Sequence, residues 1–91
     1  MKDCIFCKIR DGEIPSQKLY EDDEVFVIRD VNPRAKCHYL MIPKKHFKLL
    51  SEMGGDDEAM LGRAFSKIAR LAPSLGLSNG YRIIINQGDD G

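Results

Sequence analysis

Two apolar runs, Val25-Phe26-Val27-Ile28-Arg29 and Tyr39-Leu40-Met41-Ile42, decide the fold of this chain. The first is rich in β-branched and aromatic residues and the second is closed by Pro43, so each indicates a strand. Leu19-Tyr20 can begin a further strand, and Glu21-Asp22-Asp23 forms the turn that follows it. Two of the links between strands are too short for parallel crossovers, so we expect a mainly antiparallel sheet.

Two segments outside these runs have the spacing of helices. Apolar residues recur within Cys4–Ile9 as in one or two turns of helix, and Gly12 acts as a stop. The segment from about Asp57 to Ala72 is the clearest amphipathic helix, with acidic residues at its start and Pro73 at its end. Its apolar residues, which cover more than one narrow stripe, are Met60, Leu61, Ala64, Phe65, Ile68, Leu71 and Ala72.

Three further segments complete the expected order. Lys44 to Leu50 is interpreted as a short helix, and Asn79-Gly80 predicts a tight turn. Tyr81 to Asn86 has three consecutive isoleucines and predicts a well-buried strand. The expected class is therefore α+β, a single domain over residues 1–91 with an antiparallel sheet, one long helix and a short N-terminal helix.

Composition and charge exclude several classes of protein. The 91 residues suit one small domain, and 14 basic against 14 acidic residues give a net charge of zero, without a basic footprint for nucleic acid. No apolar run approaches the roughly 20 residues that span a bilayer, and the N-terminus lacks the apolar core of a secretory signal. Three cysteines, two of them in a C-x-x-C, do not fit a secreted disulfide framework. We expect a reduced, cytoplasmic protein.

A metal-ligand pattern lies at Cys4-x-x-Cys7, with His46 following Pro43-Lys44-Lys45. Two thiolates on one turn suit a tetrahedral zinc ion, and an imidazole can serve as a third ligand. Two other interpretations stay open. The cysteines could form a redox pair, although no strand precedes them as a thioredoxin-like motif requires, or they could be buried apolar thiols.

Three polar positions at the ends of predicted strands are candidate ligand-binding residues. Asp30 follows a strand, where a carboxylate can accept both hydroxyls of a ribose; an Asx-turn before Asn32-Pro33 is the competing interpretation. Asn86 to Gly91 is a glycine loop whose amides could bind phosphate, although hairpin turns look the same. His38 precedes a strand, where a lone histidine is usually structural.

Taken together these segments resemble one family, the histidine-triad (HIT) proteins of the Hint branch. The resemblance covers essentially the whole chain, and it is the combination in this order that is specific. The segments are Cys4-Ile5-Phe6-Cys7-Lys8-Ile9, Gly12-Glu13-Ile14-Pro15-Ser16, Tyr20-Glu21-Asp22-Asp23, Asp30-Val31-Asn32-Pro33, His38-Tyr39-Leu40-Met41-Ile42-Pro43-Lys44-Lys45-His46 and Gly80-Tyr81-Arg82-Ile83-Ile84-Ile85-Asn86-Gln87-Gly88.

The resemblance implies a role for each matching residue. Asp30 corresponds to the carboxylate that binds ribose, Asn86 to an asparagine beside the phosphate, and His38 to a histidine that orders the imidazole network. Ile28 and Val31 correspond to walls of the base pocket. The same resemblance assigns Cys4, Cys7 and His46 to a structural zinc ion.

The resemblance also implies an activity, namely hydrolysis of nucleoside phosphoramidates and related adenylylated compounds through a nucleotidyl-histidine. The family signature, His-x-His-x-His, follows the glycine loop. The given sequence ends at Gly91 within that loop, so we expect the nucleophilic histidine, the fourth zinc ligand and the last strand to lie beyond it. Two other functions stay open: a nucleotide-binding module without turnover, and a zinc-stabilised interaction module.

We also expect a homodimer. The apolar residues of the long predicted helix form a surface wider than one small sheet covers, and the strand Tyr81 to Asn86 would leave an apolar edge exposed. Pairing across a two-fold axis would close that edge. The family resemblance implies the same arrangement.

Overall fold

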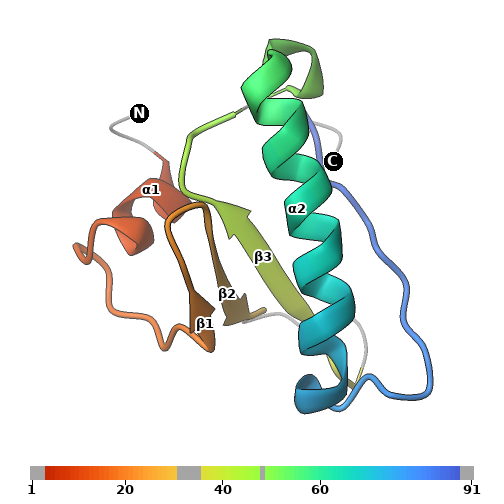
Figure 1. Cartoon of the computed structure of the whole chain (residues 1–91). Helices are drawn as coiled ribbons and strands as arrows, with labels where there is room; N and C mark the ends of the chain where they lie inside the picture. The colour runs from red at the N-terminus through yellow and green to blue at the C-terminus, as the bar shows by residue number, and fades with distance from the viewer. Residues whose placement is uncertain (1–3, 31–35, 48, 89–91) are drawn as a thin grey trace. The chain divides into compact units, whose positions relative to one another are not determined.

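The computed structural model describes residues 4–30, 36–47 and 49–88 of the chain (Figure 1). The chain divides into two compact units, Met1–His46 and Phe47–Gly91. The first contains α1 (Ile5–Arg10), β1 (Tyr20–Glu21), β2 (Val25–Arg29) and β3 (Tyr39–Pro43). The second contains the 3-10 helix η1 (Leu50–Glu52), α2 (Gly55–Leu71) and the 3-10 helix η2 (Ala72–Leu75).

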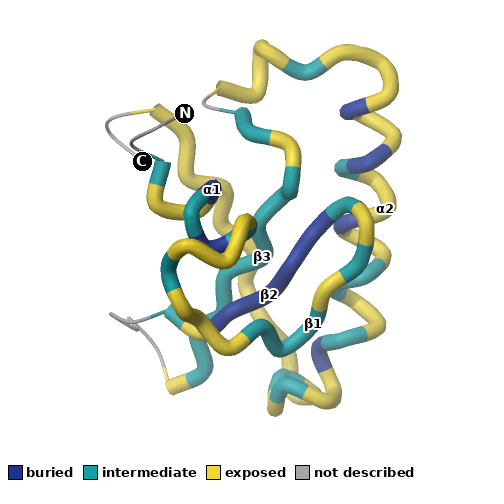
Figure 2. The backbone as a smooth tube through the Cα atoms, turned by 90° about the vertical axis from the view of Figure 1, so that its left-hand side faces the viewer, coloured by how far each residue is buried: buried dark blue, intermediate teal, exposed yellow. Residues whose placement is uncertain are grey.

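The first unit is built on an antiparallel sheet in the order β1-β2-β3. Phe26 of β2 lies opposite Ile42 of β3, and Val27 lies opposite Met41. Four of the five residues of β2 are buried, which Figure 2 shows as a continuous dark-blue segment. Successive side chains of a strand point to opposite faces, so four buried residues in a row mean that both faces of β2 are shielded from solvent, which explains its nearly continuous apolar run. The prediction of an antiparallel α+β fold is confirmed.

The turn between β1 and β2 is held by one carboxylate. Asp22 Oδ1 accepts the backbone N–H groups of Glu24, at 2.8 Å, and Val25, at 3.0 Å. Its other oxygen accepts the hydroxyl of Tyr20 at 2.7 Å. Such side-chain bonds to a turn backbone are the reason aspartate is favoured in turns, and here they fix where β2 begins.

The short helix α1 packs on this sheet through Ile9. Ile9, Phe26 and Ile28 form the buried core cluster of the unit. Partly buried apolar residues pack against that cluster, namely Ile14, Leu40 and Ile42. The helix stops where predicted, because Gly12 adopts the left-handed backbone conformation, with φ of 83°.

In the second unit, α2 confirms the long amphipathic helix. Asp57 accepts the N–H of Gly54 at 3.0 Å and so satisfies a donor at the helix start. Met60 and Ala64 are buried, in agreement with their place in the apolar pattern. The helix gives way to η2 immediately before Pro73, which lacks the N–H that an α-helix needs.

Two predicted elements are wrong. The described residues of Lys44 to Leu50 do not form a helix: the segment begins with bends and loop, and η1 begins only at Leu50. Tyr81 to Asn86 is not a strand, since among the described residues nothing pairs with it, and all six of its residues are exposed. A strand exists only through hydrogen bonds to a neighbour, which a local pattern cannot supply. The predicted turn at Asn79-Gly80 is present, with the Gly80 N–H donating to the Leu77 carbonyl at 3.1 Å.

Within the described ranges, neither α1 nor α2 is both long enough and apolar enough to cross a membrane.

Candidate functional site

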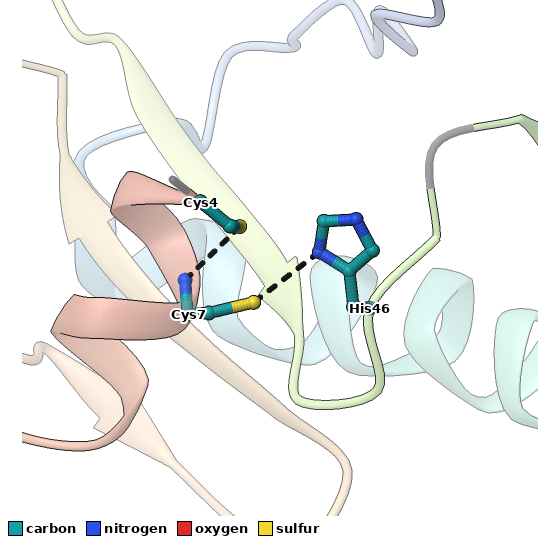
Figure 3. Close-up of side chains that lie close together, drawn as sticks. All are labelled: Cys4, Cys7 and His46. Carbon is teal, nitrogen blue, oxygen red and sulfur yellow. Dashed lines mark hydrogen bonds between the residues drawn. The ribbon is translucent and has the colours of Figure 1, made fainter. Parts of the chain in front are cut away.

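Three predicted metal ligands come together in the first unit. Cys4 and Cys7 lie at the start of α1, and His46 lies in the loop after β3, with the three side chains pointing toward one another (Figure 3). The Cys7 sulfur is 3.2 Å from His46 Nδ1, and the ligand atoms of all three residues lie within 4.8 Å of one another. The sequence pattern therefore identified a real cluster, joined across 39 positions of the chain.

The local structure of α1 explains the position of the two sulfurs. Cys4 is the N-cap residue, and its sulfur accepts the backbone N–H of Cys7 at 3.2 Å. This bond satisfies one of the donors that every helix start leaves unpaired. It also places both sulfurs on the same side of one helical turn. Cys7 is buried and Cys4 is half-buried.

The two thiols differ in acidity. Burial raises the pKa of the Cys4 thiol, but hydrogen bonds from the Cys7 side chain and from the N–H groups of Cys7 and Phe6 outweigh that effect, so its pKa lies below the ordinary value. The hydrogen bond with Cys4, together with burial and the nearby Cys4 charge, raises the pKa of the Cys7 thiol.

The donor set fits a tetrahedral zinc ion. Zinc binds thiolate sulfur at about 2.3 Å and imidazole nitrogen at about 2.0–2.1 Å, which places neighbouring donors roughly 3.5–3.8 Å apart. The distances between the donor atoms, 3.2 Å for Cys7 Sγ to His46 Nδ1 and no more than 4.8 Å for any pair, bracket those values. Two sulfurs and one nitrogen are also the donor types that zinc prefers.

Backbone and side-chain contacts hold the loop that carries His46. Lys44 donates its N–H to the Glu24 carbonyl at 2.8 Å and its ammonium to Glu21 at 2.9 Å. The carbonyl of Lys44 accepts a hydrogen bond from Arg10 of α1 at 2.6 Å. Arg10 is not among the predicted site residues, although its place three residues after Cys7, on the same helical face, is a signal that the sequence contains.

A second pair of predicted residues meets where β2 ends and β3 begins. The Asp30 N–H donates to the His38 carbonyl at 3.1 Å, and Asp30 Oδ2 lies 3.3 Å from His38 Nε2. The side chains retain 20% and 31% exposure, respectively, so the pair is reachable by a ligand. This contact follows from the sheet, because β2 and β3 are paired up to Arg29 opposite Tyr39.

The other predicted residues are placed as follows. Ile28 is buried in the core cluster with Ile9 and Phe26. Asn86 belongs to the second unit and is exposed, so its meeting with Asp30 stays a prediction. Val31 and Gly91 lie outside the described residues.

Comparison with known proteins agrees with this fold. The family model described as scavenger mRNA decapping enzyme C-term binding matches residues 3–87. Protein HitA of Neisseria gonorrhoeae is 42% identical over 91 residues, which are all of this chain and 85% of HitA.

Solved structures give the same result. A HIT family hydrolase from Clostridium thermocellum is 38% identical with a TM-score of 0.88, over 97% of this chain and 77% of that one. A histidine triad protein from Clostridium difficile is 42% identical with a TM-score of 0.88, over 99% and 79%. The chain is therefore an α+β domain that is similar to HIT family hydrolases. The chain belongs to the histidine-triad (HIT) family.

Proposed function

We propose that the protein to which this chain belongs is a hydrolase or transferase that acts on purine nucleoside phosphoramidates or related adenylylated compounds. The observation that carries the proposal is the Asp30–His38 pair, in which a carboxylate and an imidazole lie 3.3 Å apart and partly exposed beside the sheet. A carboxylate can accept both hydroxyls of a ribose, and an imidazole next to it can order further imidazoles. Similarity to HIT-family hydrolases supports the same reaction class.

In the proposed reaction the nucleophile is a neutral imidazole from the His-x-His-x-His segment that the family resemblance assigns to the region after the glycine loop. Its nitrogen attacks the α-phosphorus, a P–N bond forms to the enzyme, and the bond to the leaving amine breaks as that amine takes a proton. Water then cleaves the nucleotidyl-histidine and releases the nucleotide. Asn86 and the glycine-loop amides would stabilise the charge that develops on the phosphoryl oxygens.

Within this proposal Asp30 holds the ribose, His38 orients the nucleophilic imidazole, and the base lies beside Ile28 and Val31. Ile28 is buried in the core cluster, so it would contribute to the pocket mainly by fixing the position of the end of β2. None of these roles needs a metal ion at the phosphorus.

The proposal is tested by comparing the binding of nucleotides with and without ribose hydroxyls. Asp30→Ala removes charge-assisted hydrogen bonds worth roughly 1.5–3 kcal/mol each, so a nucleotide should bind at least about tenfold more weakly. A 2′,3′-dideoxynucleotide lacks the hydroxyls and should bind equally to both proteins. Asp23→Ala, at an exposed carboxylate in the β1–β2 turn, is the matched control and should change neither affinity. Equal weakening of both ligands by Asp30→Ala would show that Asp30 does not read the ribose.

We further propose that Cys4, Cys7 and His46 hold a structural zinc ion, with a histidine of the downstream motif as the fourth ligand. The ion would supply cross-linking of α1 to the loop after β3. The grouping of two sulfurs and one nitrogen within 4.8 Å supports this assignment. Elemental analysis of intact protein purified without chelator should give close to one equivalent of zinc. A content below about a tenth of an equivalent would count against the site. A zinc content in Cys7→Ser equal to that of the wild-type protein would also count against it.

A further inference from the structure

Arg10 joins the two parts of the chain that supply the metal ligands. Its Nη1 donates to the Lys44 carbonyl at 2.6 Å, which links the last residue of α1 to the loop that carries His46 two residues later. Arg10 also lies three positions after Cys7, so the guanidinium extends from the cysteine-bearing helix one turn beyond the buried sulfur. The contact is a hydrogen bond to a charged donor, which is stronger than a bond between neutral groups.

Both ends of this link are held in place. On one side, the guanidinium is gripped by Asp11, with Nε 2.8 Å from Oδ1 and Nη2 3.1 Å from Oδ2. Two parallel bonds fix the plane of the guanidinium, and this leaves Nη1 directed at the carbonyl. On the other side, the Lys44 backbone is anchored to the sheet through its N–H bond to Glu24.

We propose that Arg10 is a positioning residue of the metal centre, which fastens α1 to the loop after β3 and holds Cys4, Cys7 and His46 at ligand distance before a metal ion arrives. The inference rests on the proposed zinc site. A metal centre whose ligands come from two separate segments binds more weakly when those segments must first be ordered, because ordering opposes binding. Arg10 supplies that order without touching the ion.

The partial burial of Arg10 distinguishes it from a surface residue without a structural role. Its side chain is 29% exposed, against 51% for Asp11, so much of its length is covered. A purely electrostatic role is the alternative, since the positive charge of Arg10 is near both sulfurs and acts to lower the pKa of each. The positioning role and the electrostatic role make different predictions for Arg10→Lys. Lysine keeps the positive charge but lacks the planar group that bonds to Asp11 and Lys44 together.

The experiment measures zinc affinity of the full protein by competition with a chromophoric chelator. Partners outside the ligand set typically change metal affinity by 10–100-fold, and Arg10→Gln and Arg10→Lys should each weaken zinc binding by about tenfold. Cobalt(II) replaces zinc as a spectroscopic probe, and its tetrahedral absorption should be weaker in both variants at equal metal. Lys8→Gln is the matched control, because it removes one positive charge from the same helix, and it should stay within about twofold of wild type.

The outcomes separate the hypotheses. Wild-type affinity in Arg10→Lys together with loss in Arg10→Gln would overturn positioning in favour of charge, and no loss in either would overturn any role. A wild-type protein that binds no zinc would instead overturn the zinc proposal and this inference with it. Alkylation of Cys7 in metal-free protein, mapped by peptide mass, is the second measurement. In the metal-free state this buried sulfur should react faster in both Arg10 variants than in wild type, and an unchanged rate would contradict the link.

Discussion

Truncation of Phe26 tests where the core of the first unit lies. The side chain is 0% exposed in the central strand of the sheet, and it belongs to one buried cluster with Ile9 and Ile28. Because β1 and β3 hold the backbone of β2 on both edges, the strand cannot move inward to fill a void. Phe26→Ala should therefore fall in the usual range for a buried phenylalanine, about 3–5 kcal/mol.

That loss is large against the stability of a chain of this length, which is about 5–14 kcal/mol. A change of 1 kcal/mol moves the melting temperature of a small domain by about 4–8 °C, so Phe26→Ala should melt at least about 12 °C below wild type. Circular dichroism during heating, with a urea titration for the free energy of unfolding, provides the assay.

Phe6→Ala is the control, since the same atoms are removed from a side chain of the same unit that is 40% exposed. It should cost less than about 1 kcal/mol, because little water-excluded surface is lost and alanine is the better helix former. A melting temperature for Phe26→Ala within about 4 °C of wild type, or an equal fall in Phe6→Ala, would refute the placement of the core.

Two further predictions concern association and pH. We propose a homodimer that uses the segment Tyr81 to Asn86, in which Ile84 is 70% exposed. Sedimentation at low micromolar concentration should show a dimer for the intact wild-type protein and a monomer for Ile84→Lys; a wild-type monomer that Ile84→Lys leaves unchanged would contradict the proposal. Hydrogen bonds from Lys44 and then Lys18 hold the pKa of Glu21 below its ordinary value of 4.5. The stabilisation is therefore present above pH 4.5 and is lost as the pH falls through the lowered pKa, so wild type and Glu21→Gln should differ in stability at pH 7 and converge in acid. A difference that is constant from pH 7 to pH 3 would show that the ion pairs do not matter.

The sheet and the long helix were predictable because their signals are local. β2 has the predicted bounds, Val25–Arg29, since five β-branched, aromatic or long residues in a row favour an extended chain and bury well. The helix α2 differs from its prediction only at its ends, because the apolar period sets its face while the acidic residues and Pro73 set its limits only approximately. Cys4 and Cys7 were also predictable as a pair, because their spacing alone places both on one turn.

The failures have a different cause. Lys44 to Leu50 was interpreted from its own residues, but the loop follows contacts made elsewhere: Lys44 is bonded to Glu24 and Arg10, and His46 to Cys7. Those long-range bonds override a weak helical preference. Tyr81 to Asn86 has strong β-propensity, yet its state depends on a partner strand, and among the described residues there is none. The local sequence pattern therefore could not determine the secondary structure of either segment.

The two proposed metal ligands that are furthest apart in the sequence, Cys4 and His46, lie close to the first and last residues of the first unit. An ion bound to both would close a loop of roughly 40 residues, and chain-entropy models give such a closure about 4 kcal/mol at 25 °C. Every residue of the sheet lies inside that loop, so the constraint would act on the unfolded ensemble of the whole unit and not on one part of it. The heat resistance of the unit would then become a function of free zinc concentration, rising logarithmically once the concentration exceeds the dissociation constant.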